Sequence, residues 1–191
     1  MNAICKGLMC LLLLSGAQAL AASPARTDPP ADSIYRITPL HLRDQNGVRF
    51  DLAGMRGRPL VVGMFYASCQ AVCPVEIETL KRLQRALPQT LAVLLISFDP
   101  KHDVVAQLHA VADVHRVSAP AFRLCRLERG DLDGLGAVLG ITWRALPAGG
   151  YSHNVVFNLL DAQGRIAART DKMDVIDPDF VAAAKKLFAA P

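Results

Sequence analysis

Cysteine is scarce in this 191-residue sequence. Five cysteines occur, and two of them, Cys5 and Cys10, fall in an N-terminal segment that has the pattern of an export signal. The other three, Cys69, Cys73 and Cys125, are too few to staple a domain of this length with disulfides. A disulfide-rich scaffold is therefore excluded. The fold has to rest on an apolar core, for which a hydrophobic content of 52% is sufficient.

The chain also lacks a large excess of positive or negative charge. It contains no internal repeats and no low-complexity blocks. The chain carries 21 basic and 17 acidic residues, which gives a net charge of +4. The longest uninterrupted basic run in the second half of the chain is only the pair Lys185-Lys186. Nucleic-acid binding therefore has no support, and we expect no nucleic-acid partner.

The N-terminus lacks an apolar run long and unbroken enough to read as an ordinary membrane span. It has instead the parts of a signal peptide: a positive charge at Lys6, an apolar core at Leu8–Leu14, and small-residue cleavage patterns such as Ala17-Gln18-Ala19. We expect the protein to be exported. It would then be either free in the periplasm or anchored through this segment in the inner membrane, facing the periplasm. The predicted division is a signal peptide or N-terminal anchor at residues 1–21, a flexible Pro-rich linker at 22–34 and one domain at 35–191.

Cys69-Gln70-Ala71-Val72-Cys73-Pro74 lies between a predicted strand and a predicted helix. The strand is the apolar run Leu60–Tyr66. The helix has apolar residues at steps of three and four from Ile77 to Leu87, with Pro74 in its first turn and two acidic residues, Glu76 and Glu78, near its positive end. Unpaired N–H groups at a helix N-terminus stabilise a thiolate, so this position favours thiol chemistry.

The rest of the chain predicts a mixed α/β sheet with helices on both faces. The cysteines then lie at the carboxyl end of the first buried strand, where open α/β sheets place their sites. Cys125 is expected to be a small buried residue on a strand. The other predicted elements are a hairpin at 37–51 turning at Asn46-Gly47, strands at 91–98, 122–127, 154–160 and 165–170, a helix capped by Asp103, a short helix at 131–139, an exposed loop at 141–150 and a final helix from Asp177-Pro178.

Three kinds of chemistry suit a Cys-x-x-x-Cys pair at this position. A structural zinc site needs four ligands, and no second pair of Cys or His stands at ligand spacing. A redox dithiol needs only the two cysteines, with Cys69 on the exposed side as the attacking thiol. Two thiolates are also soft ligands for copper, and an imidazole would complete such a site. His153 is the best candidate for it, because it stands at the start of the predicted strand 154–160, just after Gly149-Gly150. The histidines His102, His109 and His115 are spaced seven and six residues apart and do not form a cluster.

Three segments together resemble the Sco/SenC family of copper chaperones: Tyr66–Pro74, Ser97–Pro100, and His153 followed by Phe157–Gly164. The resemblance implies a thioredoxin-like fold with an added N-terminal β-hairpin. It implies one copper ion bound by Cys69, Cys73 and His153, with Asp99 at most a supporting residue. It also implies a role in maturing the copper site of cytochrome c oxidase, as metallochaperone, thiol reductant or both. The implied partners are the oxidase subunit that carries this site and other copper or thiol-redox proteins.

The sequence departs from the family pattern around both parts of the site. Many members have Pro where Gln70 stands and Asp where Ser152 stands, and a carboxylate beside the histidine would orient its ring. Lys101-His102-Asp103-Val104 replaces the usual Arg-Asp-Thr-Pro. Two alternatives stay open: a thiol–disulfide oxidoreductase that uses Cys69 and Cys73 without a metal, and a thiol peroxidase. The peroxidase would need a supporting hydroxyl and arginine, for which Ser68, Thr79, Arg58 and Arg144 are the candidates.

Overall fold

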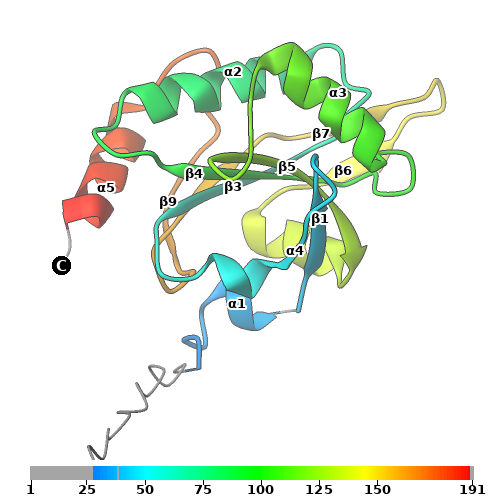
Figure 1. Ribbon diagram of the computed structural model, residues 1–191. Coiled ribbons are helices and arrows are strands. Elements are labelled where there is room, and N and C mark those ends of the chain that lie inside the picture. The colour runs from blue at the N-terminus through cyan, green and yellow to red at the C-terminus, as the bar shows by residue number, and fades with distance from the viewer. Residues whose placement is uncertain (1–27, 38, 190–191) are drawn as a thin grey trace, which may run out of the picture.

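The computed structural model describes residues 28–37 and 39–189. Its centre is a seven-stranded sheet with the strand order β2-β1-β5-β4-β3-β8-β9 (Figure 1). The elements along the chain are α1 (Ile34–Ile37), β1 (His41–Asp44), β2 (Arg49–Asp51), the 3-10 helix η1 (Leu52–Met55), β3 (Leu60–Phe65), α2 (Val72–Arg85), β4 (Ala92–Ser97), α3 (Val105–His115), β5 (Phe122–Arg129), α4 (Leu132–Leu139), β6 (Trp143–Ala145), β7 (Tyr151–His153), β8 (Phe157–Leu160), β9 (Ile166–Thr170) and α5 (Pro178–Ala189).

The central strands β3, β4 and β5 are parallel, and the outer strands pair antiparallel. Every residue of β3 and β4 is buried, as expected of strands covered on both faces. Alternate side chains of β3 enter different cores: Val61 and Phe65 face one, while Val62 and Met64 face the other. The predicted parallel strand–helix–strand unit around the cysteines is therefore confirmed.

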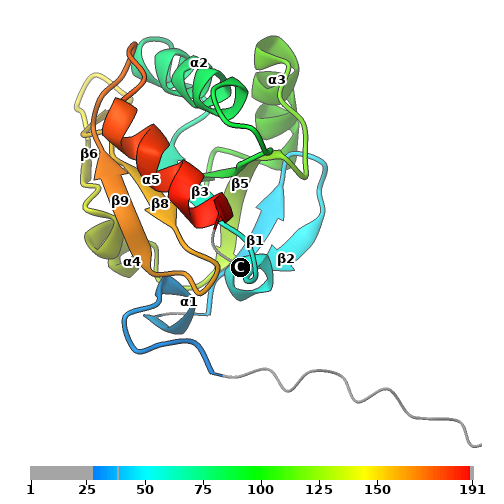
Figure 2. The same cartoon turned by 90° about the vertical axis from the view of Figure 1, so that its left-hand side faces the viewer.

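Helices cover both faces of the sheet, as predicted. Helices α2 and α3 lie over one face, while α4 and the short α1 lie over the other (Figure 1). Helix α5 packs beside α2 on the outer part of the sheet, against β9 (Figure 2). The carboxyl ends of β3 and β4 thus meet the start of α2 at one edge, and the cysteine motif lies at this edge.

The predicted N-terminal hairpin is confirmed as β1 and β2, whose turn contains Gly47 at a φ of 77°. Packing begins slightly earlier than the expected boundary at residue 35. The Ser33 hydroxyl donates a hydrogen bond to the carbonyl of Gln163, and Ile34 is buried. The predicted signal peptide or anchor lies outside the described residues. Within the described ranges, no helix has the length and hydropathy needed to cross a membrane.

The segment 141–150 is mostly exposed, as predicted, but part of it is a strand and not a loop. It forms most of a two-stranded ribbon, in which β6 pairs with β7 and Trp143 lies opposite His153. Gly149 and Gly150 have φ values of 89° and 75° and provide its turn. The Trp143 ring stacks on Phe98 at 5.3 Å, which fixes the ribbon to the domain. Glycines that indicate a loop in the sequence therefore make a hairpin turn here.

Two polar residues near the motif also differ from their predicted roles. Asp103 does not cap α3, whose N-cap residue is Val104. Glu76 does not lie at the solvent-exposed start of α2. Its side chain is fully buried, and neither of its carboxylate oxygens has a hydrogen-bond partner.

Candidate metal and dithiol site

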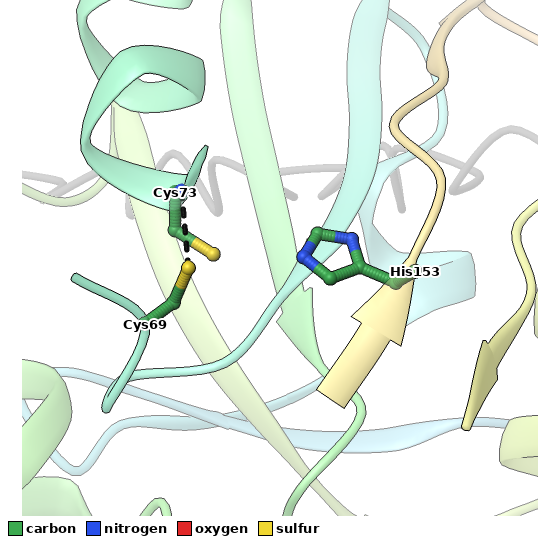
Figure 3. Close-up of side chains that lie close together, drawn as sticks. All are labelled: Cys69, Cys73 and His153. Atoms are coloured by element: carbon green, nitrogen blue, oxygen red, sulfur yellow. Dashed lines mark hydrogen bonds between the residues drawn. The ribbon is translucent and has the colours of Figure 1, made fainter. Parts of the chain in front are cut away.

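The two cysteines lie where β3 passes into α2. Cys69 is in the connecting turn, and its N–H donates to the carbonyl of Tyr66 at 3.2 Å. Cys73 is in the first turn of α2, and its N–H donates to the Cys69 sulfur at 3.3 Å (Figure 3). Cys69 is partly exposed, whereas Cys73 is 3% exposed. The start of the helix therefore supports the outer sulfur with a main-chain N–H group.

The surroundings of the two thiols shift their pKa values in opposite directions. Burial raises the pKa of Cys69, but hydrogen bonds from the Cys73 thiol and from the main chain of Cys73, Ala71 and Val72 outweigh it and lower the pKa. Burial raises the pKa of Cys73, and the negative charge of Glu76 adds to the rise. Cys69 is thus the thiol that ionises first, and the thiolate is the form that attacks disulfides and binds metals.

His153 completes a group of three potential ligands. One ligand atom each from Cys69, Cys73 and His153 lies within 4.8 Å of the other two. The residue ends β7 rather than starting the next strand, and its ring extends toward the two sulfurs (Figure 3). Nδ1 of His153 lies 3.1 Å from the carbonyl oxygen of Asn154. A hydrogen bond there leaves Nε2 as the nitrogen that faces the sulfurs.

Aromatic side chains surround the imidazole. The His153 ring lies 5.1 Å from the Phe98 ring and 5.9 Å from the Tyr66 ring. The Tyr151 ring packs against both of these rings, at 5.3 Å from Phe98 and 5.2 Å from Tyr66. The side chains therefore limit the movement of the imidazole.

Asp103 holds the loop that carries Cys69, a role that the sequence analysis missed. Its carboxylate accepts a hydrogen bond from the N–H of Ala67 at 2.8 Å and another from the Ser97 hydroxyl. Burial raises the pKa of Asp103, although both hydrogen bonds oppose the rise. Asp99 lies beside it: its N–H donates to the Ser97 hydroxyl, and its carboxylate lies 2.8 Å from Nδ1 of His102. An acidic residue 36 positions from its main-chain partner leaves no local signal in the sequence.

The remaining candidates lie elsewhere or have other partners. His102, His109 and His115 each pair with a different carboxylate and do not gather. Cys125 is fully buried on β5, as predicted.

A groove of about 470 Å³ adjoins the cysteines. Its walls are mainly apolar, and none of the hydroxyl or arginine candidates for a peroxidase lines it; the lining includes Pro74, Ile77, Val111, Val114 and His115.

The donor set fits a soft metal ion. Two sulfurs and one imidazole nitrogen match the ligands that Cu(I) prefers. Metal–sulfur and metal–nitrogen bonds of about 2.0–2.3 Å need ligand atoms about 4 Å apart. The observed limit of 4.8 Å lies within a small side-chain adjustment of that spacing. Among the described residues, no other group of three Cys, His, Asp or Glu side chains meets this criterion.

Comparison with known proteins assigns the chain to a family. The family model described as SCO1/SenC matches residues 31–188, which is most of the chain. The chain belongs to the SCO1/SenC family. No curated protein matches the sequence.

Solved structures show the fold of this SCO1/SenC protein to be thioredoxin-like. A SCO1/SenC family lipoprotein from Bacillus anthracis matches with a TM-score of 0.67 and 19% identity over 78% of this chain and 93% of its own. BsSco, a member of the Sco family of cytochrome c oxidase assembly proteins, matches with 0.66 and 16% over 86% and 100%. Arabidopsis thaliana ScoI with copper bound matches with 0.63 and 16% over 78% and 96%.

Proposed function

We propose that this SCO1/SenC protein binds one copper ion per chain through Cys69, Cys73 and His153 and serves the maturation of the copper site of cytochrome c oxidase. The observation that carries the proposal is the approach of the three ligand atoms to within 4.8 Å. Two relatives support it: Arabidopsis thaliana ScoI was solved with copper bound, and BsSco belongs to a family of oxidase assembly proteins. Copper is the cargo in this proposal.

Each residue has a distinct part in holding and releasing the ion. Cys69 ionises first and offers the exposed sulfur, from which a partner can take the cargo. Cys73 loses its proton on binding, since metal ligation requires the thiolate. Nδ1 of His153 is held by the main chain, so Nε2 is presented to the sulfurs without a neighbouring carboxylate. Oxidation of the pair to a disulfide would remove both sulfur ligands and release the metal.

The departure at Ser152 is consistent with this arrangement. A carboxylate before the histidine would orient the ring in many members, but here the Asn154 carbonyl lies against Nδ1. A neutral carbonyl oxygen attracts the Nδ1–H group less strongly than a charged carboxylate does, so it orients the ring less firmly. We therefore expect copper binding that is weaker than in members with an Asp at this position.

The second candidate is thiol–disulfide exchange without a metal. The opposed pKa shifts of the two thiols favour it, because an attacking thiolate beside a protonated partner is what a dithiol oxidoreductase needs. The two functions share both cysteines and differ in their need for His153. Both functions are compatible with export to the periplasm, with or without a membrane anchor. The relative from Bacillus anthracis, which is a lipoprotein, supports export.

An anaerobic Cu(I) competition titration separates the two functions. The reduced domain is compared with His153→Ala and with the control His109→Ala, which removes an exposed imidazole paired with Asp113 on α3. We expect one tight equivalent for the wild type and the control. Binding in His153→Ala should weaken by at least about 10- to 100-fold, since substitution of residues that only hydrogen-bond to a metal ligand already weakens metal binding by this much. Equal binding by all three proteins would remove His153 from the site, and the absence of binding would favour thiol exchange alone.

A further inference from the structure

Tyr66 contacts all three residues of the candidate site, although the Cys-x-x-x-Cys pattern assigns it no role. Its carbonyl accepts the hydrogen bond from the N–H of Cys69. Its own N–H is a hydrogen-bond donor to the Cys73 thiol, where it opposes the rise in that pKa. Its ring meets the His153 ring edge-on, at 5.9 Å and 87°. One residue thus links both sulfurs and the imidazole.

The Tyr66 hydroxyl lies between the Cys69 sulfur and the β6–β7 ribbon. Burial and the nearby Cys69 charge raise the pKa of the hydroxyl, and both the Cys69 side chain and the main chain of Tyr151 lie close enough to act on it. Gly150 leaves room for it, because a Cβ at that position would lie 3.3 Å from the hydroxyl oxygen. A glycine at the ribbon turn therefore lets the phenol reach the site.

We propose that Tyr66 is a positioning residue of this site, whose hydroxyl donates a hydrogen bond to the Cys69 sulfur while its ring orients the His153 imidazole. The metal part of this inference rests on the proposed copper function, whereas the hydroxyl–sulfur contact applies to the metal-free dithiol as well. A reduced, negatively charged sulfur is a better acceptor than a disulfide sulfur. The hydroxyl should therefore stabilise the reduced dithiol relative to the disulfide.

The matched variants are Tyr66→Phe and Tyr151→Phe. Each keeps an aromatic ring in the same cluster and removes one hydroxyl. The Tyr151 hydroxyl interacts with Asp99 and not with either cysteine, so its loss controls for packing and polarity. Phe retains the ring contacts, and we expect both variants to fold.

The first readout needs no metal: the equilibrium between the dithiol and the disulfide in glutathione buffers. A hydrogen bond to a charged acceptor changes such an equilibrium by about tenfold, which corresponds to about 30 mV for this two-electron couple. Tyr66→Phe should favour the disulfide by this amount, and Tyr151→Phe should stay within about twofold of the wild type. An unchanged equilibrium in Tyr66→Phe, or an equal shift in both variants, would overturn the proposal.

The second readout is Cu(I) competition, in which Tyr66→Phe should bind about tenfold more weakly than Tyr151→Phe. Equal affinities of the two variants would contradict a role of the hydroxyl in metal binding. A wild type that binds no Cu(I) would refute the proposed copper function, and the glutathione equilibrium would then decide the role of Tyr66 by itself. The two failures are therefore distinguishable.

Discussion

The fully buried Glu76 makes the stability of the domain depend on pH in a predictable direction. Burial raises the pKa of Glu76 well above its ordinary value of 4.5, and the Cys69 charge adds to this effect. The carboxyl therefore stays protonated in the folded chain at pH values where it ionises in the unfolded chain. Its contribution to stability is fully present below pH 4.5 and is lost as the pH rises toward the folded-state pKa.

The slope of this loss follows from linkage. Between the unfolded and the folded pKa, one carboxyl proton is released on unfolding, and the free energy of unfolding falls by about 1.4 kcal/mol for each pH unit. Glu76→Gln has nearly the same shape and does not ionise. Its stability relative to the wild type should therefore increase by this amount per unit above pH 4.5. The titrating groups that do not interact with Glu76 are common to both proteins and cancel in the comparison.

The assay is urea unfolding of the reduced domain at a series of pH values. Glu78→Gln is the control, since Glu78 lies on the same helix but is half-exposed, and a hydrogen bond from Lys81 lowers its pKa. The control should lose stability relative to the wild type as the pH rises, by less than about 1 kcal/mol because the ion pair is exposed. Parallel curves for the wild type and Glu76→Gln would refute the reasoning, because they would mean that Glu76 ionises normally in the folded protein.

Three further substitutions test the supports of the site. Asp103→Ala leaves the N–H of Ala67 and the buried Ser97 hydroxyl without an acceptor. It should lower the free energy of unfolding, measured by urea denaturation, by about 2–4 kcal/mol. A loss below about 1 kcal/mol would contradict the role assigned to Asp103. Asn154→Ala removes side-chain hydrogen bonds to Thr142, just before β6, and to Gly140, at the end of α4, so amide hydrogen exchange in β6 should accelerate while exchange in β4 is unchanged. The same change of exchange rate in both strands would argue against this link. Asp131→Ala removes the N-cap of α4 and should lower the free energy of unfolding by about 1 kcal/mol, whereas Asp133→Ala in the same turn should lower it by less. Equal losses of stability in the two variants would exclude a capping effect.

The fold could largely be predicted because its central elements have clear local patterns. The continuous apolar runs of β3 and β4 indicate strands buried on both faces, and the spacing from Ile77 to Leu83 indicates the inner face of α2. Strand β6 was predicted as part of a loop, because it has only three residues and its stabilising contact is the stacking of Trp143 on Phe98. A contact between distant residues leaves no pattern within the segment itself.

The site was only partly predictable from the residues themselves. Cys69 and Cys73 stand out by their spacing after a strand, whereas His153 was a candidate from its position that the family resemblance strengthened. The roles of Asp103 and Tyr66 at the site were not predicted, because sequence spacing does not reveal the contacts involved. Asp103 accepts a hydrogen bond from a distant main-chain N–H group, and the Tyr66 phenol lies near the Cys69 sulfur. Glu76 was misplaced because acidic residues near a helix N-terminus usually face solvent.

X-ray absorption spectroscopy of the Cu(I)-loaded, reduced protein tests the central claim most directly, because it reports the atoms bound to the metal. Coordination by Cys69, Cys73 and His153 predicts a first shell of two sulfur atoms and one nitrogen atom, with the outer-shell scattering of an imidazole. The His153→Ala variant should lose the imidazole signal and retain both sulfurs. A wild-type spectrum with sulfur ligands alone, or an imidazole signal that persists in the variant, would contradict the account.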